Sequence, residues 1–130
     1  MKPAADSDGG ILIAEDHRPT ADLLHRLLAA EFPGYLLRTA YSAEEALAQC
    51  RAAEPRVVIM DISLPGMNGI EATRRIKACA PAVQVVMHSA LDPRIYAEEC
   101  AKAGASAYVG KAKPQAELVP VVARLLHAAR

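Results

Sequence analysis

The sequence has no excess charge of either sign, because 15 basic residues balance 15 acidic residues in a chain of 130. A balanced chain has no electrostatic footprint for nucleic acid or for an anionic membrane. It also contains no apolar run as long as a bilayer-spanning helix requires. We therefore expect a cytoplasmic protein that contacts neither nucleic acid nor membrane directly through this chain.

Cysteine is also scarce. The three residues of this type, Cys50, Cys79 and Cys100, are odd in number and far apart in the sequence. That spacing fits neither a disulfide framework nor a zinc site. We expect each of them to be a small buried or half-buried side chain in a reducing compartment.

The beginning of the chain lacks the apolar core of a signal peptide. Residues 1–9 are short of large apolar side chains, and we expect them to form a disordered lead-in. The whole chain is 52% hydrophobic, and the part after residue 9 is long enough for one core. We therefore expect a single domain over residues 10–130.

The most informative stretch is a short apolar run, Val57–Met60, that ends on Asp61. Three of its four residues are β-branched, as is typical of a strand buried on both faces. Turn-forming residues follow, so the chain leaves the strand in a loop. Asp61 taken alone could simply cap that loop, but ligand sites of open α/β sheets also form at the carboxyl ends of the strands.

Strand and helix patterns alternate along the whole chain. Apolar strands are expected at residues 11–14, 35–40, 57–60, 83–87 and 106–110, and each is followed by a helical pattern. Helix starts are indicated by Ser42 with Glu45 and by Asp92 with Pro93, and Gly104 marks a helix end. Pro120 should kink the last helix. The pattern predicts an α/β, flavodoxin-like three-layer sandwich with a five-stranded parallel sheet of order 2-1-3-4-5.

Polar residues follow the strands at the edge where this fold places ligands. Glu15 and Asp16 follow the first strand, Asp61 the third, Ser89 the fourth and Lys111 the fifth. Each has an unremarkable interpretation on its own, as a turn residue or a solvated side chain. Their joint occurrence favours a site in which Mg²⁺, Lys111 and Ser89 neutralise a phosphoryl group on a nucleophilic carboxylate.

Four segments resemble the response-regulator receiver domains, the CheY-like family, over about residues 10–129. They read ILIAEDH at residues 11–17, MDISLPGMNGIE at 60–71, VMHSA at 86–90 and GASAYVGK at 104–111. The second is highly specific, and it is most similar to receivers that are fused to LuxR-type helix-turn-helix outputs.

The resemblance implies a role for each matching residue. Asp61 would be the phosphoacceptor, and Glu15, Asp16, Asp61 and the Ser63 backbone carbonyl would hold Mg²⁺, with Mn²⁺ as a possible substitute. The phosphate-binding and switch residues would be Ser89, Ala90, Tyr108 and Lys111.

The resemblance also implies partners. The phosphoryl donor would be a sensor histidine kinase or a phosphotransfer protein. The chain would catalyse its own phosphorylation and dephosphorylation without being an enzyme in the ordinary sense. The surface formed by the helix at 93–104, the strand at 106–110 and the helix from Pro114 would select an output, with a phosphorylation-dependent homodimer as one outcome.

Two features depart from the commonest family pattern. Ala112 follows Lys111 where many members have proline, so no cis peptide bond is implied there. The sequence also contains no helix-turn-helix segment. It therefore fits a stand-alone regulator, a phosphorelay intermediate, or the receiver part of a longer regulator of transcription.

Two other interpretations stay open at this point. A divalent-metal phosphohydrolase would use Asp16, His17, Asp61 and His88 as ligands, although no two-histidine motif with ligand spacing supports it. A degenerate receiver would bind partners without phosphorylation, but all the site residues are present. Ser63 and Leu91 occupy positions that tune the phosphate lifetime in this family.

Overall fold

A computed structural model describes residues 9–128 of the chain. The strands are β1 (Ile11–Ala14), β2 (Leu37–Ala40), β3 (Val57–Met60), β4 (Gln84–Ser89) and β5 (Ala107–Gly110). The helices are α2 (Arg18–Glu31), α3 (Ala43–Ala52), α4 (Gly69–Cys79), α5 (Pro93–Ala103) and α6 (Val119–Leu126), with a π-helical turn, η1 (Pro114–Leu118), before the last one. None of the helices in this part of the chain is long and apolar enough to cross a membrane.

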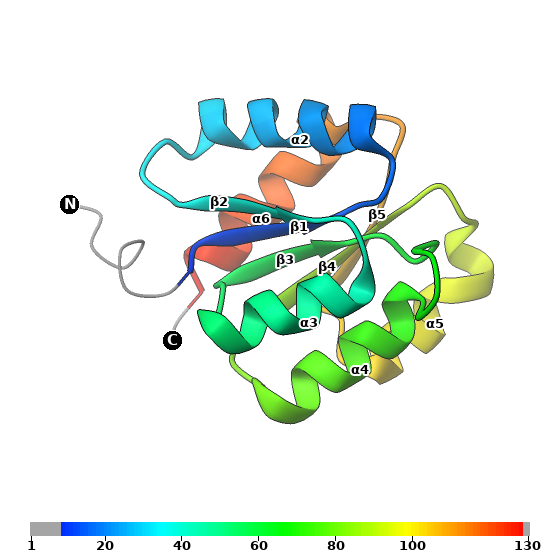
Figure 1. The fold of residues 1–130 in the computed structure, drawn as a ribbon. Coiled ribbons are helices and arrows are strands. Elements are labelled where there is room, and N and C mark those ends of the chain that lie inside the picture. Colours follow the sequence, from blue (N-terminus) through cyan, green and yellow to red (C-terminus); the bar gives the residue numbers. More distant parts are fainter. Residues whose placement is uncertain (1–8, 129–130) are drawn as a thin grey trace.

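The five strands form one parallel sheet in the order β2-β1-β3-β4-β5, which confirms the predicted fold. Figure 1 shows α2 and α6 on one face of this sheet and α3, α4 and α5 on the other. Because β1 and β3 are neighbours at the centre, the residues that follow them meet at the same edge. The register pairs Ala14 with Met60, so Glu15 and Asp61 are the next residues on adjacent strands.

Apolar side chains fill the space on both faces of the sheet. Alternate residues of the central strands point to opposite faces, so Leu12 and Val58 belong to the core under α3, α4 and α5. Ile13 and Ile59 belong to the core under α2 and α6. This burial on both faces explains why the strands read as continuous apolar runs.

Most predicted helix ends are confirmed. The Ser42 hydroxyl accepts a hydrogen bond from the Glu45 amide at 3.1 Å, and the Asp92 carboxylate accepts one from the Arg94 amide at 2.9 Å. Gly104 ends α5 in the left-handed conformation, with φ of 109°. The predicted limits of the strands are less accurate. The strand β2 begins at Leu37 and not at residue 35, and β4 ends at Ser89 and not at residue 87.

The chain is irregular before Pro120, but the irregularity is not the predicted kink inside a helix. The first turn after Pro114 is π-helical, and the Val119 amide donates to the Pro114 carbonyl. The α-helix begins only at Val119, which places Pro120 in its first turn. A proline there costs no helical hydrogen bond, because the first amides of a helix have no partner within it.

Residues 1–8 of the predicted lead-in lie outside the described residues. Gly9, its last residue, is buried, and its carbonyl accepts a hydrogen bond from Arg38 Nε at 3.3 Å.

Candidate functional site

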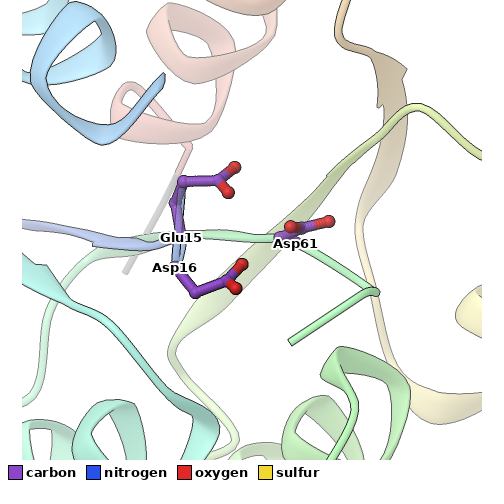
Figure 2. Close-up of side chains that lie close together, drawn as sticks. All are labelled: Glu15, Asp16 and Asp61. Carbon is purple, nitrogen blue, oxygen red and sulfur yellow. The ribbon is translucent and has the colours of Figure 1, made fainter. Parts of the chain in front are cut away.

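Three carboxylates lie together at the carboxyl edge of the sheet. Figure 2 shows Glu15 and Asp16, at the end of β1, with their carboxyl groups directed to the side where Asp61 follows β3. One oxygen from each residue lies within 4.8 Å of the other two. Glu15 and Asp61 are buried, whereas Asp16 is exposed. Among the described residues this is the one group of side chains that could hold a metal ion.

The donor atoms of this cluster suit a hard divalent cation. All three are carboxylate oxygens, and no histidine or thiol joins them within residues 9–128. Oxygen ligands of this kind are preferred by Mg²⁺, which keeps several waters and takes one or two carboxylates. The exposed Asp16 leaves one side of the cluster open to such waters.

Lys111 supplies the fixed positive charge of the site. Its Nζ lies 2.7 Å from Glu15 Oε1 and 3.2 Å from Asp61 Oδ2. Burial alone would lower the pKa of this lysine, but the hydrogen bond to Glu15 and the charges of Asp61 and Glu15 outweigh burial and raise it. Lys111 is therefore charged at neutral pH and bridges the two buried carboxyl groups.

Backbone amides orient the same two carboxyl groups. The His17 amide donates to Glu15 Oε2 and the Ser63 amide donates to Asp61 Oδ1, each at 3.1 Å. Burial raises the pKa of the Glu15 carboxyl and Asp61 adds to the rise, while Lys111 and the His17 amide oppose it. The structure thus places Ser63 beside Asp61 through its amide, and the role of its carbonyl as a metal ligand stays a prediction.

Ser89 and Tyr108 are linked through the loop that follows β4. Ser89 is buried, and its hydroxyl accepts a hydrogen bond from the Leu91 amide at 3.0 Å. The Leu91 carbonyl accepts one from the Tyr108 hydroxyl at 2.8 Å. The hydroxyl of Tyr108 therefore already contacts this loop. The family resemblance names Ser89 and Tyr108 together as switch residues, but the sequence does not indicate the route through Leu91, because the linking groups belong to the backbone.

Lys111 and Ser89 also border a cleft of about 560 Å³ beside the carboxylates. Ala90 contributes to its wall, together with residues of the loops after β4 and β5. A small side chain at this position leaves the space next to Ser89 open. As expected from Ala112, no cis peptide bond occurs among the described residues.

The two histidines required by the hydrolase interpretation do not join the metal cluster. The His17 ring contacts Thr20 Oγ1 at 2.7 Å. His88 is 2% exposed, and its ring nitrogens have no hydrogen-bond partner in the part of the chain that the structure describes. Burial, and then Lys111, lower the pKa of His88 to about 4, so the ring is neutral. The predicted mixed oxygen and nitrogen ligand set is therefore not brought together.

Comparisons with known proteins agree with this geometry. A family model described as the response regulator receiver domain matches residues 11–123. The transcriptional activator protein ExaE of Pseudomonas putida is 35% identical over 117 residues, which are 90% of this chain and 55% of that protein. Response regulator GacA of Pseudomonas viridiflava is 32% identical over 112 residues, covering 86% of this chain and 52% of that protein.

Solved structures of response regulators have the same fold as this chain. A LuxR-family two-component response regulator from Aurantimonas sp. SI85-9A1 superposes with a TM-score of 0.81 and 35% identity, over 92% of this chain and 86% of that one. The predicted similarity to receivers of LuxR-type regulators is thereby confirmed. This chain spans about half the length of the curated relatives that it matches. With the family model covering most of its length, the chain belongs to the response-regulator receiver domains of two-component systems.

Proposed function

We propose that Asp61 accepts a phosphoryl group while Glu15, Asp16, Asp61 and the Ser63 carbonyl hold Mg²⁺, with Mn²⁺ as a substitute. The observation that carries this proposal is the arrangement of three convergent carboxylates with Lys111 at 2.7 Å from Glu15 and 3.2 Å from Asp61. Such a site combines a nucleophile with a cation-binding pocket and a fixed positive charge.

In the reaction, an oxygen of Asp61 forms a bond to phosphorus as the bond between phosphorus and the donor breaks. With a phosphohistidine donor whose other ring nitrogen carries a proton, the imidazole takes the electron pair of the broken P–N bond and leaves as the neutral ring. Mg²⁺, held by these ligands, would supply positive charge next to the phosphoryl oxygens. In this proposal Lys111 Nζ, which is 3.2 Å from Asp61 Oδ2, leaves it for one of these oxygens, and the Ser89 hydroxyl donates to another. The Ser63 amide holds Asp61 in orientation through its 3.1 Å hydrogen bond to Oδ1.

The rest of the proposal concerns partners. A sensor histidine kinase or phosphotransfer protein supplies the phosphoryl group, in the cytoplasm, and hydrolysis of the aspartyl phosphate resets the chain. Of the relatives named above, ExaE is a transcriptional activator and GacA a response regulator, and about half the length of each is matched. We infer that this receiver controls an output of the same kind, through its α5, β5 and α6 surface and through a homodimer. A stand-alone regulator or a phosphorelay intermediate is the alternative.

A labelling experiment tests the site. The protein is incubated with a small acyl phosphate and Mg²⁺, and its intact mass is measured before and after hydroxylamine. One phosphoryl group per chain, lost in hydroxylamine, is expected for the wild type and for Asp22→Asn, which alters an exposed aspartate on α2. Asp61→Asn should take up none. Equal labelling of Asp61→Asn would show that another residue is the acceptor.

A further inference from the structure

His88, the last residue but one of β4, is a buried polar side chain without a hydrogen-bond partner. It is 2% exposed, and neither Nδ1 nor Nε2 has a partner among the described residues. Burial and then Lys111 lower the pKa of its ring to about 4, so at neutral pH the ring is neutral and one nitrogen is an unused acceptor. A buried polar group without a partner lowers the stability of the fold, so its presence beside a functional site requires an explanation.

The sheet order places His88 along the path of the Lys111 side chain. Strand β4 lies between β3 and β5 (Figure 1), so Lys111, which follows β5, reaches Asp61, which follows β3, across the end of β4. Val86 and Val109 belong to the core under α2 and α6. Residues two positions further along a strand point to the same face, which directs His88 and Lys111 to that side of the sheet. Lys111 and Asp61 are also the two charged groups that act on the pKa of this ring.

Lys111 has an unused hydrogen-bond donor. An ammonium group carries three N–H donors, and Nζ contacts two acceptors, Glu15 Oε1 at 2.7 Å and Asp61 Oδ2 at 3.2 Å. It has no third acceptor within residues 9–128. The lysine and His88 are not bonded to each other here, because the contact with Glu15 draws Nζ toward β1, beyond β3.

A phosphoryl group on Asp61 would bring Nζ back toward β4. This step rests on the function proposed above, in which Lys111 binds one phosphoryl oxygen and Ser89 donates to another. Ser89 follows His88 directly on β4, whereas Glu15 follows β1, two strands away. A phosphoryl group shared by Ser89 and Lys111 therefore draws Nζ away from Glu15 and toward the ring of His88.

We propose that His88 is a positioning residue, whose unprotonated ring nitrogen accepts a hydrogen bond from Lys111 when the lysine binds the phosphoryl group. The bond gives Nζ a partner on the β4 side in exchange for Glu15, and so favours the phosphorylated form over the resting one. A neutral ring suits this role, because an imidazolium would repel the ammonium group of Lys111.

Nitrogen NMR of the histidine rings tests the contact directly. The full chain is isotope-labelled in the rings of its four histidines, and the signals of His88 are identified by their loss in His88→Gln. In EDTA, one His88 nitrogen should have the chemical shift of an unprotonated nitrogen without a hydrogen bond. Saturation with beryllofluoride and Mg²⁺ should move this signal upfield, as accepting a hydrogen bond does. The signals of His25, which is exposed on α2, should not move.

The affinity for beryllofluoride gives a second readout. His88→Leu removes the acceptor and should bind about tenfold more weakly, the size of one hydrogen bond to a charged group. His88→Gln keeps an acceptor and should stay within about threefold of the wild type. Ile59→Val, a packing change in the same core, is the matched control and should bind as the wild type does. In EDTA, urea unfolding should show His88→Leu to be at least as stable as the wild type, so weaker binding cannot come from misfolding.

The possible failures are distinguishable. An unmoved His88 nitrogen signal in the saturated adduct would overturn the proposal, as would wild-type affinity in His88→Leu. If Asp61→Asn also takes up no phosphoryl group while the wild type does, the phosphoacceptor stands and only the role of His88 falls. A wild type that binds no beryllofluoride would instead contradict the proposed function, and this inference with it.

Discussion

At the scale of single residues, Lys111 decides the electrostatics of the candidate site. Two buried carboxyl groups so close together would repel each other if both were ionised. The ammonium group of Lys111 lies between them, 2.7 Å from Glu15 and 3.2 Å from Asp61. Asp16 has no such partner among the described residues and is exposed. Of the three carboxylates, Asp16 is therefore the one whose negative charge a bound cation would neutralise most.

The first prediction concerns Asp16→Asn. This change replaces a charged carboxylate ligand by a neutral amide oxygen, so the apparent affinity for Mg²⁺ should fall about tenfold. Without metal, the melting temperature should equal or exceed that of the wild type, because repulsion with Glu15 and Asp61 is reduced. Calorimetric titration with Mg²⁺ and thermal unfolding in EDTA measure the two effects, with Asp22→Asn as control. A metal-free melting temperature clearly below wild type would argue against a crowded acidic site.

The second prediction concerns the buried ring of His88. Its pKa is about 4 in the folded chain, compared with 6.5 for the unperturbed group. The unfolded state therefore binds more protons between these values, and stability is lost as the pH falls from 6.5 toward 4. At about pH 5 this residue should cost about 2 kcal/mol of unfolding free energy. His88→Met removes the titrating group at similar volume.

Urea unfolding in EDTA at about pH 7 and about pH 5 measures this contribution. The wild type should lose about 2 kcal/mol more than His88→Met between the two conditions. The variant should be at least as stable as wild type at about pH 5, because a neutral ring with unsatisfied nitrogens is replaced by an apolar side chain. Identical pH dependence in both proteins would show that the ring is solvated or paired.

At the scale of elements, the ends of helices were predictable wherever a local rule decides them. A hydrogen bond to a nearby backbone amide marks the helix starts at Ser42 and Asp92, and a left-handed dihedral angle marks the helix end at Gly104. Because these features are local, the sequence alone predicts where these helices begin and end. The turn before Pro120 was not predictable in this way. Its π-helical bond joins Val119 to Pro114, and how the chain packs between β5 and α6 decides that spacing.

The third prediction tests one such helix end. Gly104 has φ of 109°, and a Cβ atom there would lie 2.7 Å from Lys77 Cγ. The ammonium group of Lys77 donates to the Pro81 and Val83 carbonyls, each at 2.7 Å, so this side chain cannot move freely. Gly104→Ala should therefore lower the unfolding free energy by about 1 kcal/mol or more.

Gly110→Ala is the matched control for this change. Gly110 lies on β5 with no atom within 4 Å of an added Cβ, and its φ is not positive. Its effect on urea unfolding should stay within about 0.5 kcal/mol. A larger loss for Gly110→Ala than for Gly104→Ala would contradict the assigned backbone strain.

At the scale of the whole molecule, the sheet order and the site edge were predictable from the sequence. The alternation of apolar runs specifies a parallel sheet, and β1 and β3 then bring Glu15 and Asp61 together. The resemblance predicted that Ser89 and Tyr108 act together, but the route between them was not predictable, because it passes through the amide and the carbonyl of Leu91. The neutral state of His88 was not predictable either, because it follows from burial in the folded chain and from the charge of Lys111, which is distant in the sequence.

That link gives the fourth prediction, which concerns communication across the molecule. A phosphoryl group on Asp61 should draw the Ser89 hydroxyl toward it, and Leu91 and Tyr108 should follow through their hydrogen bonds. A beryllofluoride adduct mimics this group. It should shift NMR amide signals at Tyr96, Ala103, Tyr108 and Val119, which lie on α5, β5 and α6.

Ser89→Ala should bind the adduct and transmit much less of the change. A coupling free energy of the usual size, about 1 to 3 kcal/mol, would shift the population of the loop about five- to 150-fold. Shifts confined to residues around Asp61, alike in wild type and Ser89→Ala, would contradict this route to the output surface.

The central claim, that the Asp61 carboxylate takes the phosphoryl group, is tested most directly by trapping the acyl phosphate. The chain is phosphorylated with an acyl phosphate and Mg²⁺, reduced with borohydride, and digested for tandem mass spectrometry. Reduction converts an aspartyl phosphate to homoserine, and we predict homoserine at position 61, with EDTA preventing its formation. Conversion at Asp16 or Glu15, or conversion at position 61 that proceeds equally well in EDTA, would contradict the account.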